Sequence, residues 1–449
     1  MKIENVTPLP APSLSAASTQ FDAAPLRIVI AGSVDDGKST LTGRFLYDAG
    51  LLLDDQLAAL EAHSTLIDGG PDFAALTDGL TDEREQGITI DVAYRYFALH
   101  GRRVILADVP GHEQYTRNMV TAASDADAMV LLVDAERGPT PQTWRHLTLA
   151  LLLGVSHIVV AVNKMDRIGF DSDRFADLSG GIQRRAAAFD PAYLHIMPVS
   201  ALAGDNVVSA SQSMPWYSGE TLFDLLAGLP AAGEAATPLP ADEMRLPVRY
   251  VSRPAQAARR AYLGRLAGGP LAVGDTIAVS PGGRRAVVEH LYALGEPVAS
   301  ADAGQSVSVV LDRDLDIARG DVFIPAGDTA PASRSAGAAL ETVLFWFGIE
   351  PQVPGRVYEL KTQTRSVRTR IETVSAFLDA TDQKRVSPDR PPAENDIALA
   401  VLAPEDPVAV TSYRHSRSGG SFILIDPDTH ETVAAGLIGK DVIPAALYA

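Results

Sequence analysis

Residues 32–40 have the types and spacing of a phosphate-binding loop, the pattern GxxxxGKS. An apolar run at 26–31 precedes the pattern and a helix-compatible run at 40–47 follows it, which is the strand–loop–helix order that such a loop needs. Glycines let the loop N–H groups point at phosphate oxygens, and the helix N-terminus favours the same anion. The alternative is an ordinary glycine-containing turn. The loop consists of Gly32, Ser33, Val34, Asp35, Asp36, Gly37, Lys38, Ser39 and Thr40.

Two residues of this loop, and two further along the chain, have expected roles around the phosphates. We expect the Lys38 ammonium to contact the β- and γ-phosphates and the Ser39 hydroxyl to bind the Mg²⁺ that bridges them. Asp108 follows the apolar run 104–107, and a carboxylate at a strand end can hold Mg²⁺ through a water. Gly111 has no side chain to hinder a bond from its N–H to the γ-phosphate. By itself the tetrapeptide 108–111 is more typical of a turn.

A third motif, residues 163–166, follows the run 158–162 and predicts which base is bound. The Asp166 carboxylate can accept two hydrogen bonds, from N1–H and the exocyclic amine of guanine, whereas adenine has no donor at either position. Asn163 would brace neighbouring loops, and the aliphatic stem of Lys164 would cover one face of the base. A backbone N–H after the run 196–199 would reach guanine O6, from the triplet Ser200, Ala201 and Leu202.

Residues 82–90, Asp-Glu-Arg-Glu-Gln-Gly-Ile-Thr-Ile, lie between the first two motifs. They are either a charged, solvated turn before a strand or a switch loop. In the switch hypothesis the Thr89 hydroxyl completes the Mg²⁺ shell only while the γ-phosphate is present, and hydrolysis releases the loop. The predicted Mg²⁺ ligands are therefore Ser39, Thr89 and Asp108.

The elements that must position these motifs alternate between β-like and helical segments from residue 26 to about 230. This pattern predicts an α/β fold with a doubly wound, mostly parallel sheet, whose ligands bind beyond the carboxyl ends of the strands. After a Pro- and Ala-rich linker, short strand-like runs divided by Gly, Pro and Asp indicate two β-barrels, with a scaffold role as the plain alternative. We predict a disordered tail at 1–24, a GTP-binding domain at 25–238, and β-barrel domains at 239–333 and 334–449.

Composition excludes several classes of protein. The 449 residues, 46% hydrophobic and 21% charged, are typical of a soluble protein with two to four globular domains. No run predicts a membrane helix, the N-terminus is a poor signal peptide, and no cysteine is present for disulfides or thiolate metal sites. We therefore expect a cytoplasmic protein. A net charge of −18 argues against broad nucleic-acid binding.

The phosphate loop, EREQGITI, DVPGHEQYTRNM, GPTPQT and NKMD occur in this order, and with them the chain resembles the translation-factor GTPases, which include elongation factor Tu. That family also has a GTPase domain followed by two β-barrels. The resemblance implies that His112, directly after Gly111, orients the attacking water. In the family, apolar residues at the positions of Val34 and Ile88 control the access of this histidine to the water. The expected catalytic residues are thus Lys38, Thr89 and His112.

Several stretches are closer to one branch, the large, GTP-hydrolysing subunit of bacterial heterodimeric sulfate adenylyltransferase. They include Asp36, where elongation factors usually carry histidine, residues 78–97, SALAGDNV at 200–207 and SMPWYSGETL at 213–222. This resemblance implies GTP and Mg²⁺ as cofactors and a small catalytic subunit as partner. In that family the small subunit makes adenylylsulfate and diphosphate from ATP and sulfate, and GTP hydrolysis in the large subunit drives the step.

From the composition we expect neither a membrane nor a nucleic-acid partner. The alternative hypothesis is an elongation-factor-type GTPase that acts on tRNA or the ribosome, since such a protein shares every GTPase motif and differs in what its barrels bind. A regulatory GTPase that only binds partners is less favoured, because His112 supplies a residue for hydrolysis.

Overall fold

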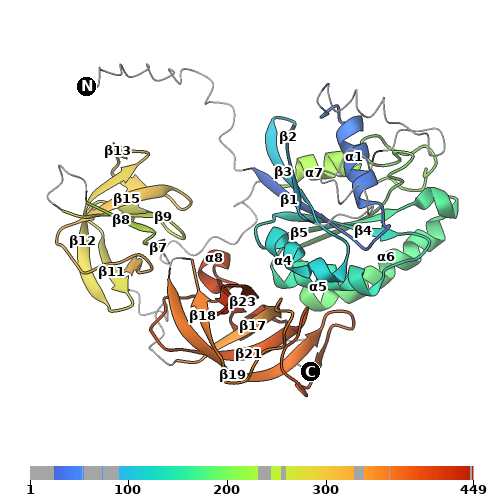
Figure 1. The fold of residues 1–449 in the computed structure, drawn as a ribbon. Helices are drawn as coiled ribbons and strands as arrows, with labels where there is room; N and C mark the ends of the chain where they lie inside the picture. The colour runs from blue at the N-terminus through green and yellow to red at the C-terminus, as the bar shows by residue number, and fades with distance from the viewer. Residues whose placement is uncertain are drawn as a thin grey trace, which may run out of the picture.

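The computed structural model describes residues 25–52, 54, 73, 91–230, 244–253, 259–327, 338–363, 365–444 and 447. These residues form an α/β domain, a middle antiparallel β domain and a C-terminal β-barrel (Figure 1). The predicted tail, the switch segment with Thr89, and both predicted boundaries between domains lie outside the described residues. Within the described part of the chain, no helix has the length and hydrophobicity to cross a membrane.

The α/β domain contains one six-stranded sheet in the order β2-β3-β1-β4-β5-β6. Every neighbouring pair is parallel except β2 and β3, which are antiparallel. All residues of β4 and β5 are buried, because these central strands are covered on both faces. The strands are β1 (Leu26–Ala31), β2 (Ala93–Leu99), β3 (Arg102–Asp108), β4 (Ala128–Asp134), β5 (His157–Asn163) and β6 (Tyr193–Pro198).

Helices cover both faces of this sheet and define two apolar cores. One core lies under α4 and α5, and the other under α1 and α7. α5 begins where the sequence dictates, because the Thr140 side chain accepts a hydrogen bond from the Thr143 N–H and Pro141 occupies the first helical position. The helices are α1 (Lys38–Asp48), α4 (Thr116–Ser124), α5 (Pro141–Leu152), α6 (Ser172–Ala186) and α7 (Leu222–Gly228).

The middle domain is antiparallel, and its main sheet follows the path β7-β16-β11-β12-β15-β9-β8. It has an apolar core of its own. Arg245 exchanges backbone hydrogen bonds with Ala267, which brings the first strand of the path to the end of β9. The strands of the path are β7 (Leu246–Pro247), β8 (Tyr250–Ser252), β9 (Ala261–Arg265), β11 (Thr276–Ser280), β12 (Arg284–Ala293), β15 (Ser306–Leu311) and β16 (Val322–Pro325).

Three shorter strands complete the middle domain. They are β13 (Glu296–Pro297), which pairs with β12, and β10 (Leu271–Ala272) and β14 (Ser300–Ala301), which pair with each other.

The C-terminal domain is a closed barrel, because the path β18-β22-β23-β17-β21-β19 returns to β18 through the β18–β19 pairing. β20 (Lys384–Val386) extends β19, and a short helix α8 (Arg417–Gly420) precedes β22. The barrel strands are β17 (Leu340–Trp346), β18 (Val357–Lys361), β19 (Ser366–Asp379), β21 (Ile397–Pro404), β22 (Ser421–Ile425) and β23 (Thr432–Ile438).

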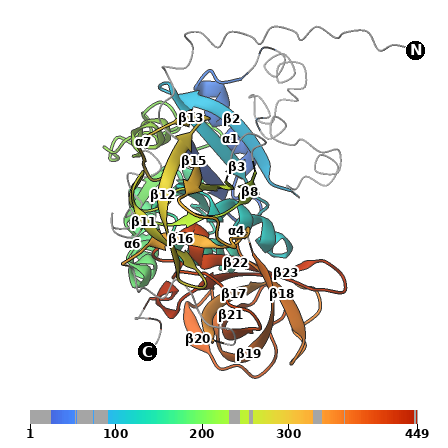
Figure 2. The same cartoon turned by 90° about the vertical axis from the view of Figure 1, so that its left-hand side faces the viewer.

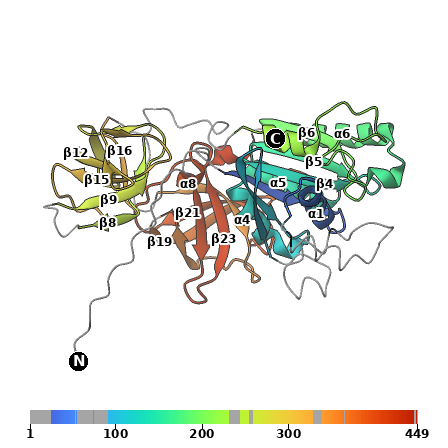
Figure 3. The same ribbon diagram turned by 90° about the horizontal axis from the view of Figure 1, so that it is seen from above.

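The barrel packs directly against the α4 and α5 side of the α/β domain, as Figures 2 and 3 show. One apolar core runs across this junction and includes Leu149 of α5 with Phe345 and Leu399 of the barrel. Hydrogen bonds also cross this junction. The buried Tyr413 hydroxyl donates to the Leu153 carbonyl (2.9 Å), and the Thr148 hydroxyl donates to the Ala380 carbonyl (3.0 Å). The barrel and the helices beside the sheet are therefore one packed unit.

Candidate nucleotide-binding site

The phosphate loop connects β1 to α1 through a turn that only glycine can make at its last position. Gly37 has φ 92°, and a Cβ built there would lie 2.6 Å from the Asn163 side-chain nitrogen. The Leu41 N–H donates to the Gly37 carbonyl (2.8 Å), so the helix starts at once and presents its N-terminal N–H groups to the loop. The structure therefore gives residues 32–40 the local form that an anion site requires.

Lys38 lies inside this loop. Its Nζ donates to the carbonyls of Gly32 (3.1 Å) and Ser33 (2.9 Å). A Cβ on Gly111 would lie 2.5 Å from the same Nζ, so the segment after β3 closes on the loop from the other side. Burial lowers the pKa of Lys38 from its ordinary value, and the nearby Asp108 carboxylate opposes that shift. A buried cation whose hydrogen bonds go to loop carbonyls, with carboxylates nearby, fits a site made for phosphate oxygens.

The expected Mg²⁺ ligands lie at the same edge of the sheet as far as the structure describes them. Asp108 is the last residue of β3 and is buried, while Ser39 is half-buried in the first turn of α1. No group of three metal-ligating side chains occurs among the described residues. Mg²⁺ at a nucleotide needs only one or two protein oxygens beside phosphates and waters, so a hydroxyl and a carboxylate fit it. Thr89, the third expected ligand, is outside the described residues.

The base-binding motif lies at the ends of β5 and β6 and is held by its own hydrogen bonds. The Asn163 side-chain oxygen accepts from the Ala201 N–H (2.9 Å), and its nitrogen donates to the Asp36 carbonyl (2.8 Å). The Ser200 hydroxyl donates to Asp166 Oδ1 (2.6 Å). Within the described chain Asp166 Oδ2 makes no hydrogen bond. The carboxylate is thus oriented by one oxygen and has the other available for a ligand.

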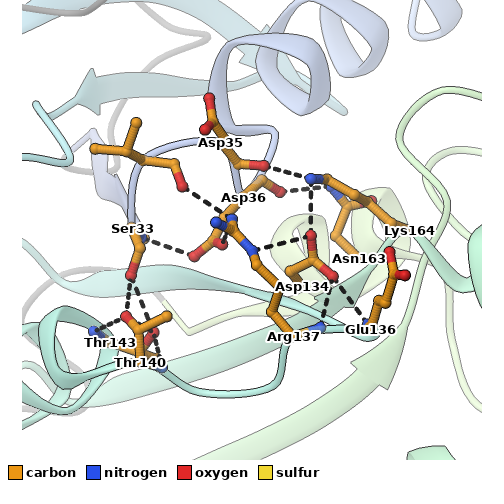
Figure 4. Close-up of polar contacts among 12 residues, drawn as sticks. Ser33, Asp35, Asp36, Asp134, Glu136, Arg137, Thr140, Thr143, Asn163 and Lys164 are labelled. Atoms are coloured by element: carbon orange, nitrogen blue, oxygen red, sulfur yellow. Dashed lines mark hydrogen bonds and ion pairs between the residues drawn. The ribbon is translucent and has the colours of Figure 1, made fainter.

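A bridge of charged groups connects this base end to the phosphate loop (Figure 4). Lys164 Nζ pairs with Asp134 Oδ2 (2.8 Å) and also donates to the Asp35 carbonyl. Arg137 Nη2 donates to both the Val34 carbonyl and Asp36 Oδ1, each at 2.9 Å. The Lys164–Asp134 pair joins the ends of β5 and β4, and the other three bonds join these segments to the loop.

The pKa values of the two buried carboxylates of this bridge are shifted in opposite directions. Burial raises the pKa of Asp36 despite a hydrogen bond from the Ser33 N–H and the charges of Lys38 and Arg137. Burial also acts to raise the pKa of Asp134, but the hydrogen bonds from Lys164 and from the Arg137 and Glu136 N–H groups outweigh it and hold the pKa below its ordinary value. Asp134 is therefore the firmly ionised member, and Asp36 depends on its cationic neighbours.

The start of α5 is also attached to the phosphate loop. The Ser33 hydroxyl hydrogen-bonds the Thr140 hydroxyl and lies 3.2 Å from the Thr143 hydroxyl. Sequence reasoning assigned no role to Asp134, Arg137, Thr140 or Thr143. Two features of the sequence could have indicated these residues. Asp134 comes right after an apolar run, and the segment GPTPQT, which contains Thr140 and Thr143, is part of the family resemblance. Neither feature identifies a partner for Ser33.

The structure gives fewer contacts for the remaining predicted site residues. His112 follows Gly111 and is half-buried, with its ring edge-on to Tyr115 at 6.3 Å between centroids. Leu202 is 46% exposed, and its carbonyl accepts from Arg44 Nη1 (2.9 Å). Val34 is half-buried beside the loop, and Ile88 lies outside the described residues.

Comparison with known proteins agrees with this geometry. Residues 24–231 match the family model "Elongation factor Tu GTP binding domain", and residues 339–439 match "GTP-eEF1A C-terminal domain-like". The chain is 42% identical over 431 residues to sulfate adenylyltransferase subunit 1 of Chromobacterium violaceum, covering 94% of this chain and 88% of the relative.

Two further relatives extend the comparison. Sulfate adenylyltransferase subunit 1 of Rhizobium meliloti is 44% identical, with 95% of this chain and 84% of the relative covered. The bifunctional enzyme CysN/CysC of Mycobacterium tuberculosis is 43% identical, with 93% of this chain but only 67% of the relative covered.

Proposed function

The chain belongs to the sulfate adenylyltransferase subunit 1 family, and on this premise we propose that GTP hydrolysis in its α/β domain drives adenylylsulfate formation on a partner subunit. Of the two hypotheses that the sequence left open, family membership favours sulfate activation over action on tRNA or the ribosome. The predicted division into residues 25–238, 239–333 and 334–449 is part of the same proposal.

One observation carries the nucleotide assignment: Asp166 is oriented by Ser200, beside an Asn163 that bonds both Ala201 and the phosphate loop. A carboxylate in this position accepts from the N1–H and exocyclic amine of guanine, and the Ser200–Leu202 segment supplies a backbone donor for O6. An adenine base would leave the carboxylate unmatched. We therefore assign GTP as the nucleotide.

We assign GTP hydrolysis to the residues at the phosphate end of the site. The Lys38 ammonium, which bonds the Gly32 and Ser33 carbonyls, would offset the charge of the GTP phosphates. Ser39, Asp108 and Thr89 are the proposed Mg²⁺ ligands, and bound Mg²⁺ neutralises charge on the β- and γ-phosphates. His112 holds and orients the attacking water beside Gly111.

Coupling is the reason for a second subunit. Forming adenylylsulfate and diphosphate from ATP and sulfate is strongly uphill, so the step needs a linked downhill reaction. We assign adenylyl transfer to the small catalytic subunit. Coupling would require the segments that contain Thr89 and Gly111 to be ordered differently with GTP and with GDP, and the small subunit to prefer one of the two states.

The direct test is reconstitution of the full chain with the purified small subunit. We expect adenylylsulfate formation from ATP and sulfate to rise when GTP is added, and to fall back when a non-hydrolysable GTP analogue replaces it. GTP hydrolysis that is stimulated by ribosomes and indifferent to the small subunit and sulfate would instead support the elongation-factor alternative.

A further inference from the structure

The outer face of the middle domain carries apolar side chains at several positions where strand alternation predicts polar ones. Along β9, β12 and β15 the core-facing residues include Tyr262, Leu291 and Val309, so their neighbours should face solvent. Yet Leu263 and Tyr292 flank Ser308 across the three strands, and Val310 is opposite His290 in the next row. These rows form the floor of a groove of about 1190 Å³ on the domain surface. Figure 2 views the molecule from the side on which this domain lies.

Leu294 stands at one end of this groove and is fully exposed. It lies in the turn between β12 and β13 with φ 51°, a conformation that glycine or asparagine adopts at much lower cost. Its side chain therefore gains nothing from the fold of this chain and occupies a position better suited to another residue type. An apolar side chain displayed in this way is typical of a contact with another molecule.

The charged residues of the groove are mostly basic, although the chain as a whole carries −18. Arg249 is exposed, and within the described residues its guanidinium makes no hydrogen bond or ion pair. Arg265 donates through its Nε to the Gly304 carbonyl (2.9 Å). Arg259 is paired with Glu289, the one carboxylate among the described lining residues. Arg249 and Arg265 thus have no carboxylate partner in the described part of the chain.

We propose that this groove, defined by Arg249, Leu263, Arg265, Tyr292, Leu294 and Val310, binds an extended segment of the small subunit in which acidic side chains flank an apolar one. The acidic side chains pair with Arg249 and Arg265, and the apolar side chain covers Leu294 and the floor. The inference rests on the proposed function, because it takes the partner subunit as the occupant.

The lining favours a protein over a nucleic acid. Nucleic-acid binding takes its affinity from several basic side chains on phosphates, whereas in the described lining only Arg249 and Arg265 lack a carboxylate partner. A peptide can fill the apolar floor with side chains and satisfy both arginines with carboxylates. Interfaces draw their affinity from such buried apolar and arginine anchors.

The test measures affinity between the full-length chain and the purified small subunit, for instance by analytical ultracentrifugation. We expect Leu294→Asp and Arg249→Glu each to raise the dissociation constant by about tenfold or more, because each removes an anchor and places a negative charge against an acidic segment. The salt dependence of binding should also weaken in Arg249→Glu. Intrinsic GTP hydrolysis should not change in either variant, since neither residue belongs to the nucleotide site.

Matched controls separate this groove from general surface effects. Ile349→Asp changes another highly exposed apolar residue, in the barrel, and Arg285→Glu reverses an exposed charge in β12 outside the groove lining. Both should bind the small subunit like the wild type. Equal losses in controls and groove variants, or unchanged binding in the groove variants, overturn the groove assignment alone.

Two other outcomes have different meanings. If the wild-type chain neither binds nor stimulates the small subunit, the proposed function fails and this inference fails with it. If the groove variants keep small-subunit binding but lose binding of deacylated tRNA, used as the nucleic-acid probe, the occupant is an RNA and the assignment to a protein is wrong.

Discussion

The two ends of the nucleotide site differ in how their side chains are held. At the base end, Asn163, Ser200 and Asp166 bond one another or a neighbouring backbone group in an arrangement that can accept guanine directly. At the phosphate end, Lys38 is bonded to the carbonyls of its own loop, and bound phosphates would compete with these contacts. The difference teaches that base selectivity rests on oriented acceptor groups, whereas phosphate binding rests on a buried ammonium and the N–H groups of the loop.

The bridge of Arg137, Lys164 and Asp134 joins these ends, so neither acts alone. Lys164 belongs to the base motif, yet it bonds Asp134 and the Asp35 carbonyl of the phosphate loop. Arg137 holds the same loop through Val34 and Asp36. Breaking the site at its base end, its phosphate end and its bridge should therefore give three distinct signatures.

The largest effect is expected at the base end. Asp166→Asn replaces an acceptor with an amide that can donate to the C2 oxygen of xanthine, so preference should move from GTP to xanthosine triphosphate. Selectivity built on such hydrogen bonds can change by on the order of 10⁴-fold. Competition between the two nucleotides measures it, and Asp173→Asn, an exposed carboxylate in the first turn of α6, is the control. Retained GTP preference would refute the base contact.

At the phosphate end the change should affect turnover and leave binding intact. His112→Ala removes the group that we assign to the attacking water, and we expect the single-turnover rate of GTP hydrolysis to fall by about 10²-fold or more. The dissociation constant for GTP should stay within a few-fold of the wild type. Tyr115→Phe, which keeps the ring beside His112, serves as the matched control. A fully active His112→Ala would remove His112 from the mechanism.

Breaking the bridge should mainly change the rate of nucleotide release. Arg137→Ala removes the bonds to Val34 and Asp36 and leaves a buried carboxylate without its cation, so we expect GDP dissociation to accelerate by about tenfold. A fluorescent GDP analogue chased by excess GDP measures the rate. Arg137→Lys should recover part of the effect. An unchanged rate would mean that the bridge does not hold the loop.

A pH series sharpens this result. Burial already raises the pKa of Asp36, and Arg137 opposes that shift, so Arg137→Ala should raise the pKa further. As the pH falls, Asp36 becomes protonated and its unpaired charge disappears. The release rate of Arg137→Ala should then approach that of the Arg137→Ala/Asp36→Asn double variant. Parallel pH profiles for the two would contradict a role for the Asp36 charge.

Much of the fold could be predicted because local patterns agree with it. The apolar run 26–31 gave both ends of β1 correctly, and the runs 104–107 and 158–162 lie within β3 and β5. The sequence prediction omitted β2, whose residues alternate between half-buried and exposed because it is an edge strand paired only with β3. An alternating run with polar residues among tyrosines does not form the continuous apolar block expected of a parallel sheet.

The site was predictable where motifs follow strands and unpredictable where contacts depend on the packed fold. The phosphate loop, the segment 108–111 and the base motif each lie at the carboxyl end of a strand, so the parallel sheet brings them to one edge. The Arg137–Asp36 pair and the Ser33–Thr140 contact span more than 100 residues, and nothing in local spacing marks which arginine or threonine reaches the loop. The common core between α5 and the barrel depends on tertiary packing in the same way.

The smallest expected effect tests whether that junction matters to the nucleotide site. Tyr413 is buried and its hydroxyl donates to the Leu153 carbonyl next to the end of α5, whose other end contacts the phosphate loop through Thr140. Burial raises the pKa of Tyr413, so the hydroxyl remains a donor through mildly alkaline pH. Tyr413→Phe should lower the free energy of unfolding by about 1 kcal/mol, as for one lost hydrogen bond. Denaturant titration measures the loss, with the more exposed Tyr193→Phe as control. We expect GTP affinity to remain unchanged, because α5 keeps its apolar contacts with the barrel; a weaker affinity would show that the barrel supports the phosphate end.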